Sequence, residues 1–170
     1  MGINSRSCKP GHRLRLGGGA TRILEDTVAY LRIRRQFDRP IGSFQALKHR
    51  AASWKILVEG ISALTRHCAE LSDDRDPARS GISSAAKASA SETYRSVAGD
   101  AVQLHGGIGF TWDHECHLFL KRAQLNAALF GSVIQHKDRA AEFAFAEALG
   151  SRNDRRRMLA QLTDPGTLDH

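Results

Sequence analysis

The segment QLHGGIGFTWDHECH, at residues 103–117, brings possible metal ligands close to three glycines. A zinc site needs four converging ligands, which usually come in close pairs, and the sequence contains neither CxxC nor HExxH. Spacing therefore predicts no metal site. The candidate ligands are interpreted as surface or helix-start polar residues: His105, His114, Cys116 and His117. Asp113 is predicted to cap the helix that follows.

The glycines of this segment predict a turn, because each costs about 1 kcal/mol relative to alanine inside a helix. GGIG is not a dinucleotide fingerprint or a nucleotide phosphate loop, since no strand pattern precedes it and no Lys-Ser/Thr pair follows. There is also no GxSxG, and no cysteine lies in a motif typical of a reactive thiolate. Glycines do expose backbone N–H groups to a ligand, and Gln103 can hydrogen-bond an amide-like edge such as a nucleobase.

A second segment, RIRRQFDRPIGSFQ at residues 32–45, combines arginines with a turn and a new helix start. Pro40 and Gly42 stop the preceding helix, and Ser43 offers an N-cap to the next. The Arg34 guanidinium beside exposed N–H groups would suit a diphosphate. On pattern alone, an ordinary turn between helices is the alternative for both segments.

Apolar residues recur at steps of three and four along five stretches, which predicts helices. The stretches are about 16–35, 44–71, 82–104, 116–130 and 135–149. Small residues on the third helix would allow a neighbouring helix to come close. No stretch alternates with period two for long enough to predict a strand. We expect an all-α protein: an antiparallel four-helix bundle with an additional C-terminal helix. The bundle is assigned to residues 16–149, after an irregular or disordered basic start at 1–15 and before a charged, frayed tail at 150–170.

Composition and charge limit the binding partners and cellular locations that the sequence favours. The chain has 170 residues and a formal charge of +7, but its basic residues are scattered and only 6% of residues are aromatic, so nucleic-acid binding is the weaker interpretation. The first 24 residues lack acids, which leaves a targeting segment as an alternative. Three widely spaced cysteines favour a reducing, cytoplasmic location, and no apolar run predicts a membrane span.

Taken together, the two segments resemble a known family. YLRIRRQFDRPIGSFQALKHRAA resembles the Y-x-x-x-R-x-Q-F-G-x-P-I-x-x-F-Q signature of the acyl-CoA dehydrogenase C-terminal domain. AVQLHGGIGFTWDHECHLFLKRA is similar to the same family's Q-x-x-G-G-x-G-[FY]-T segment and the helix after it. The two occur in family order and at about the family's separation, and the resemblance extends from about Leu16 to Leu149.

The resemblance implies a four-helix bundle in a homo- or hetero-oligomer with acyl-CoA dehydrogenase subunits, which hold FAD between them and oxidise acyl-CoA thioesters at the α,β bond. It implies that Arg34 contacts the FAD pyrophosphate of a neighbouring subunit, that Phe37 lines that site and that Gln45 touches the cofactor. The adenosine end would be received by Gln103, Leu104, His105, Gly106 and Gly107. Ser132 stands where the family's Gly-Thr-Ser turn meets FAD.

The sequence departs from the family pattern at the catalytic base and at one turn position. Phe130 occupies the position of the glutamate that abstracts the substrate's α-proton, and phenylalanine cannot accept a proton. Some branches carry the base elsewhere, at a position that falls near Cys8 and offers no acid here. Glu25 is the nearest acid and is predicted to face solvent. Asp38 replaces a glycine, a mild change because Asp tolerates a left-handed turn.

The amino-terminal helical domain and the middle β-barrel domain of the family are also missing from this sequence. We therefore expect the C-terminal domain of an acyl-CoA dehydrogenase that is inactive by itself. The alternative is a non-catalytic subunit that completes the FAD site of a catalytic partner.

Overall fold

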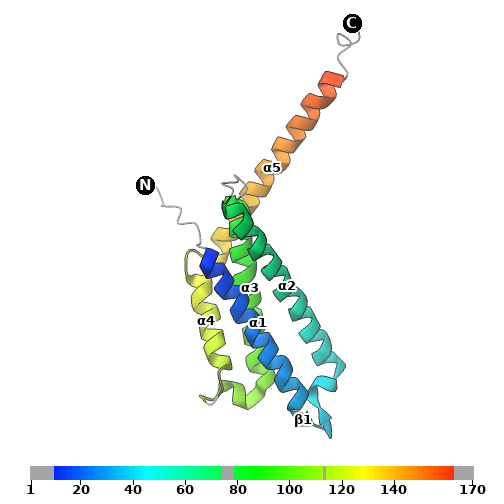
Figure 1. Cartoon of the computed structure of the whole chain (residues 1–170), viewed down its shortest axis with the longest axis vertical. Helices are drawn as coiled ribbons and strands as arrows, with labels where there is room; N and C mark the ends of the chain where they lie inside the picture. The colour runs from blue at the N-terminus through cyan, green and yellow to red at the C-terminus, as the bar shows by residue number, and fades with distance from the viewer. Residues whose placement is uncertain (1–9, 74–78, 113, 163–170) are drawn as a thin grey trace.

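Five helices build the computed structural model, which describes residues 10–73, 79–112 and 114–162. They are α1 (Pro10–Ile33), α2 (Gln45–Asp73), α3 (Arg79–His105), α4 (Cys116–Ala128) and α5 (Val133–Leu162). Helices α1 to α4 run alternately in opposite directions, side by side (Figure 1). This arrangement confirms the prediction of an all-α antiparallel four-helix bundle with an additional C-terminal helix.

Helix α3 lies at the centre, since it packs against each of the other four helices. Its inward face is built largely from small residues, and Ala90, Ala98 and Ala101 are completely buried. Tyr94 is the bulky exception, and its ring packs directly on Gly19 of α1. The small side chains let the neighbouring helices approach closely, as the sequence predicts.

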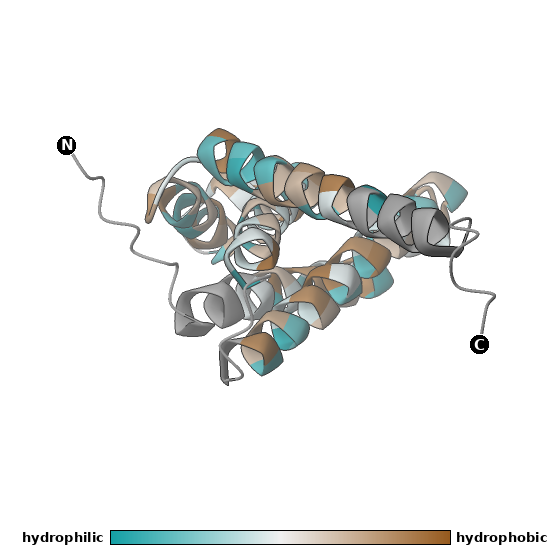
Figure 2. Cartoon of the chain, turned by 90° about the horizontal axis from the view of Figure 1, so that it is seen from above, coloured by the Kyte–Doolittle hydropathy of each residue, from teal (hydrophilic) through white to brown (hydrophobic). Residues whose placement is uncertain are grey.

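Helices α1 and α2 turn their predicted apolar stripes toward this centre. Ile23 and Leu24 are buried from α1, and Trp54, Val58 and Ile61 are buried from α2. In Figure 2 each helix carries both hydrophilic and hydrophobic residues, as amphipathic helices around one core should.

The link between α1 and α2 differs from the prediction. Strands β1 (Arg35–Gln36) and β2 (Arg39–Pro40) form an antiparallel hairpin, so the expectation of no strand is wrong at this point. Strands of two residues are too short to show period-two alternation. The hairpin turns at Phe37 and Asp38, whose φ values of 51° and 62° are both left-handed, as a two-residue type I′ turn requires. The tolerance expected of Asp38 is confirmed.

A short 3₁₀ helix, η1 (Ile41–Ser43), follows the hairpin. Ser43, the predicted N-cap, lies within it, and Phe44 is the residue directly before α2. The Phe44 carbonyl accepts the backbone N–H groups of Leu47 and Lys48, each at 3.1 Å.

Helix α5 begins against α3, where Phe143 packs directly on Gly81, and then leaves the bundle at an angle (Figure 1). It continues to Leu162, beyond the predicted bundle limit, and α1 begins at Pro10. The positions of Cys8 and Asp113 lie outside the described residues. Among the residues that the structure describes, no helix combines the length and apolarity needed to cross a membrane.

Candidate functional site

Arg34 links the end of α1 to the hairpin through its backbone. Its N–H donates to the Tyr30 carbonyl at 2.9 Å, and its carbonyl accepts the Ile41 N–H at 2.8 Å. The side chain is exposed. The guanidinium therefore extends into solvent from a backbone that is fixed on both sides.

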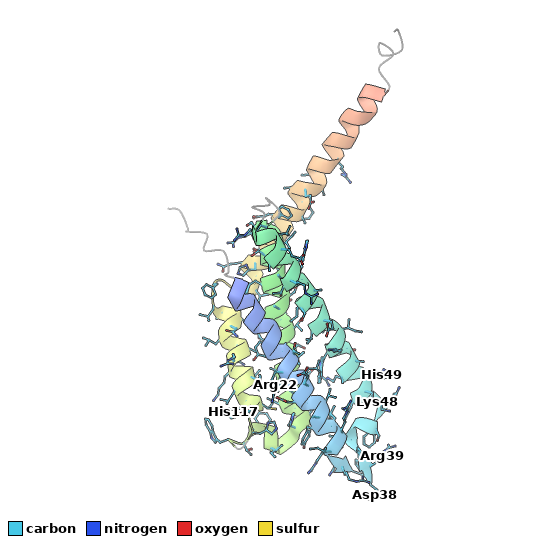
Figure 3. The ribbon with its side chains drawn as sticks, viewed as in Figure 1. Arg22, Asp38, Arg39, Lys48, His49 and His117 are labelled. Atoms are coloured by element: carbon cyan, nitrogen blue, oxygen red, sulfur yellow. The ribbon has the colours of Figure 1, made fainter. Side chains whose placement is uncertain are left out.

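The hairpin places further cations and an aromatic ring beside Arg34. Phe37 is 84% exposed, and only the edge of its ring approaches Phe44, with the ring centroids 6.1 Å apart. The Arg39 guanidinium lies over the Phe44 ring at 4.1 Å. Gln45 is exposed at the first position of α2, where backbone N–H groups are available to an anion. Figure 3 shows Asp38, Arg39, Lys48 and His49 gathered at this end of the bundle.

The glycine turn forms a second 3₁₀ helix, η2 (Gly106–Phe110), directly after α3. Gly106 is left-handed at φ +63°, and a Cβ added at Gly106 or Gly107 would meet open space. Gly109 has the opposite environment, because a Cβ there would lie 2.7 Å from the Val102 carbonyl oxygen. Gln103 is exposed, whereas Leu104 is half-buried. The turn thus presents bare backbone on its outer side.

His105 joins this turn to α1. It is only 3% exposed, and its ring stacks on Tyr30 with centroids 4.3 Å apart. The expectation of a surface or helix-start position is therefore wrong for His105, because the end of α3 packs against the last turns of α1. Since Arg34 follows Tyr30 by one helical turn, this stacking holds the two sequence segments at the same end of the bundle (Figure 1).

Tyr30 contributes to this arrangement, but it is not among the site residues predicted from the sequence. The one signal that points to it is its place four residues before Arg34 in the quoted signature.

Phe130 and Ser132 lie far from the hairpin and the glycine turn. They connect α4 to α5, at the opposite end of the bundle from the hairpin (Figure 1). Phe130 is left-handed at φ 63°, and its carbonyl accepts a hydrogen bond from His136 Nε2 at 3.0 Å. Ser132 caps α5: its Oγ accepts the Gln135 N–H at 3.2 Å, and its own N–H donates to Gln135 Oε1 at 2.9 Å. The structure therefore does not bring these residues together with Arg34 in one chain.

Acids near the Phe130–Ser132 turn are scarce. A groove beside it is lined by residues of α3, α4 and α5, and Glu92 is the only acid among the described residues that line it. Its carboxylate is ion-paired with Lys137 at 2.6 Å. Glu25 is exposed on α1, as predicted.

Burial of His105 makes the stability of the bundle sensitive to acid. Desolvation lowers the pKa of His105 below its ordinary value of about 6.5, so the folded state favours the neutral ring. The unfolded chain takes up this proton first as the pH falls, and the stability is lost progressively below about pH 6.5. Urea unfolding in chelator-containing buffer should show this decline, with a slope of at most about 1.4 kcal/mol per pH unit from this site. His105→Gln should flatten the profile, and a slope equal to that of the unmodified chain would contradict the assignment.

The exposed residues at the hairpin end fit a dinucleotide such as FAD. Cations and a helix start suit its phosphates, and the bare backbone at Gly106 and Gly107 leaves the space that a close-lying ligand needs. Exposed Phe37 offers an aromatic face.

Comparisons with known proteins identify the family of this chain. The family model described as the acyl-CoA dehydrogenase C-terminal domain matches residues 9–145. Acyl-CoA dehydrogenase IpdE2 of Mycolicibacterium smegmatis is 44% identical over 114 residues, which are 67% of this chain and 35% of that protein. FadE34 of Mycobacterium tuberculosis is 39% identical over 107 residues, 62% of this chain and 15% of its own length. The chain thus spans about a third or less of these relatives.

Solved structures show the same fold. The Tcur3481-Tcur3483 steroid ACAD G363A variant has a TM-score of 0.77 and 26% identity, covering 82% of this chain and 38% of that one. Butyryl-CoA dehydrogenase of Megasphaera elsdenii has a TM-score of 0.76 over 80% of this chain and 35% of that one, at 24% identity. With the family model matching most of the chain, this protein belongs to the acyl-CoA dehydrogenase family and corresponds to its C-terminal helical domain.

Proposed function

We propose that this chain supplies half of an FAD site across a subunit boundary and has no dehydrogenase activity by itself. The observation that carries the proposal is the pairing of the two motif segments at one end of the bundle by the Tyr30–His105 stack. Arg34 would bind the pyrophosphate, with Phe37 and Gln45 beside it. Gln103 and the outer side of Gly106 and Gly107 would receive the adenosine.

The buried side chain of His105 would act from behind the turn, by holding it against α1. Ser132 would belong to a second FAD site, since it lies at the other end of the bundle. Two sites that each take residues from one end of a subunit are consistent with an oligomer of acyl-CoA dehydrogenase subunits.

The proposed lack of activity rests on the proton that must leave the substrate. When bound, FAD supplies the hydride acceptor of acyl-CoA oxidation, but a base must remove the α-proton. Phe130 provides none, and Glu92 is held by Lys137. The missing base and isoalloxazine pocket would come from a partner or from further domains of a longer protein. Relatives almost three times the length of the matched segment support this division.

Two measurements test the proposal. The purified chain should give no dye reduction above background with a panel of acyl-CoA thioesters, and robust turnover by the chain alone would overturn it. Co-expression with the acyl-CoA dehydrogenase subunits encoded beside its gene should yield a yellow complex that contains the chain. A colourless monomer with every such neighbour would count against a non-catalytic subunit. An upstream reading frame that encodes the two missing domains would instead identify a fragment.

A further inference from the structure

Three potential metal ligands converge beneath the glycine turn. His105 ends α3, His114 precedes α4 and Cys116 begins α4, and one ligand atom from each lies within 4.8 Å of the others. Cys116 Sγ is 3.4 Å from His105 Nδ1, and the two histidine rings have centroids 4.4 Å apart. His105 and Cys116 are 3% and 0% exposed, and His114 is half-buried. All three line one groove of about 400 Å³ along α1.

The hydrogen bonds around the cluster define where lone pairs are available. His105 Nδ1 lies 2.8 Å from the Ala101 carbonyl oxygen. Because a carbonyl only accepts, Nδ1 carries the proton and Nε2 carries a lone pair. This Nε2 is buried and has no hydrogen-bond partner among the described residues. His114 Nδ1 accepts the Cys116 backbone N–H at 3.2 Å, so a metal bound at this nitrogen must replace that hydrogen bond.

A buried acceptor without a partner is unfavourable in a folded protein, because it has lost its hydrogen bonds to water without replacing them. A histidine whose Nδ1–H donates to a backbone carbonyl while Nε2 is open has the orientation that metal-bound imidazoles usually show. A thiol and a second imidazole at the same place complete a ligand set typical of zinc.

We propose that His105, His114 and Cys116 form a binding site for Zn²⁺, with a water from the groove as the fourth ligand. Zn–N and Zn–S bonds of about 2.1 and 2.3 Å require ligand atoms about 3.5 Å apart in a tetrahedron. The three residues must therefore move closer together, and Cys116 Sγ, which lies 3.4 Å from the protonated Nδ1 of His105, must turn toward Nε2. His114 can move because it is half-buried in the short segment before α4. Binding breaks the Cys116 S–H bond, forms a Zn–S bond and releases the proton to water in the groove.

The site does not depend on FAD. The ion would tie the end of α3 to the start of α4 and so close the segment that contains the glycine turn. Asp26 lines the same groove but is paired with Arg22 at 2.9 Å, which favours water in the fourth position. Figure 3 shows Arg22 on α1 and His117 at the start of α4.

Cobalt is a suitable probe, because a thiolate ligand to Co²⁺ gives a charge-transfer band in the near ultraviolet. The metal-free full-length chain should bind one Co²⁺ with this band and with the visible bands of a tetrahedral ion, and Zn²⁺ should displace it. Cys116→Ser should abolish the charge-transfer band. His114→Gln should weaken binding at least about tenfold, since even residues that only support ligands often contribute that much.

Cys68→Ser is the matched control, because Cys68 is also buried, at 2% exposed, but lies on α2. It should bind Co²⁺ as the unmodified chain does, and circular dichroism should show helix content unchanged in all variants. Absence of the charge-transfer band in the unmodified chain would overturn the proposal, as would a band that survives Cys116→Ser or disappears with Cys68→Ser. If Cys116→Ser does not fold, unweakened binding by His114→Gln would overturn it. These measurements use the chain without FAD, so their failure is distinguishable from failure of the proposed FAD half-site.

Discussion

Tyr94→Ala is expected to lower the free energy of unfolding by about 3–5 kcal/mol, the usual cost of truncating a buried aromatic ring. Tyr94 is completely buried on α3, and its ring fills the space above Gly19 of α1. Removing the ring leaves a cavity at the contact between α1 and α3. Urea unfolding of the purified chain, followed by circular dichroism, measures the loss.

Tyr94→Phe measures the contribution of the hydroxyl to stability separately from that of the ring. The hydroxyl is buried without a hydrogen-bond partner among the described residues, so its removal should leave the chain at least as stable as before. A Cβ at Gly19 would lie 2.6 Å from the Tyr94 ring and hydroxyl, so Gly19→Ala should cost about 1–3 kcal/mol in the presence of Tyr94 and less in Tyr94→Ala. Additive effects of the two changes would show that the contact is not the cause.

Under the proposed FAD half-site, Arg34→Ala is expected to weaken FAD binding about 10- to 150-fold in a complex of this chain with the proposed catalytic partner. A hydrogen bond to a charged group contributes about 1.5–3 kcal/mol, and the loss of the guanidinium removes such bonds to the pyrophosphate. The backbone of Arg34 makes the bonds that hold the hairpin, and alanine preserves these. Flavin fluorescence during titration of the stripped complex measures the affinity.

Arg139→Ala on α5 is the matched control, because this arginine is exposed and lies on a different helix. It should bind FAD normally. The FAD affinity of Arg34→Lys should lie between those of Arg34→Ala and Arg139→Ala, since lysine keeps the charge but not the planar pair of donors. Normal FAD affinity in Arg34→Ala would contradict the proposal that Arg34 binds the pyrophosphate.

Much of the fold was predictable because the apolar residues of an amphipathic helix recur at a spacing that identifies its buried face. Trp54, Val58 and Ile61 recur at steps of three and four and are all buried, and the small residues of α3 lie at the centre as expected. The hairpin at residues 35–40 was not predictable in this way, because two-residue strands leave no periodic signal. Its turn also places Phe37 in a left-handed conformation that its residue type does not suggest.

By itself, the sequence determined the helices, the family and the motif residues, since these depend on residue types at fixed spacings along the chain. Only the tertiary structure decided how separate segments meet. It stacked His105 on Tyr30 inside the bundle, placed Ser132 at the end opposite Arg34, and brought one side-chain atom each of His105, His114 and Cys116 within 4.8 Å of the others. Ligand spacing predicted no metal site because the segment lacks the close ligand pairs of a CxxC or HExxH motif. The approach of the three side chains in space depends on the packing of α3 and α4 against α1.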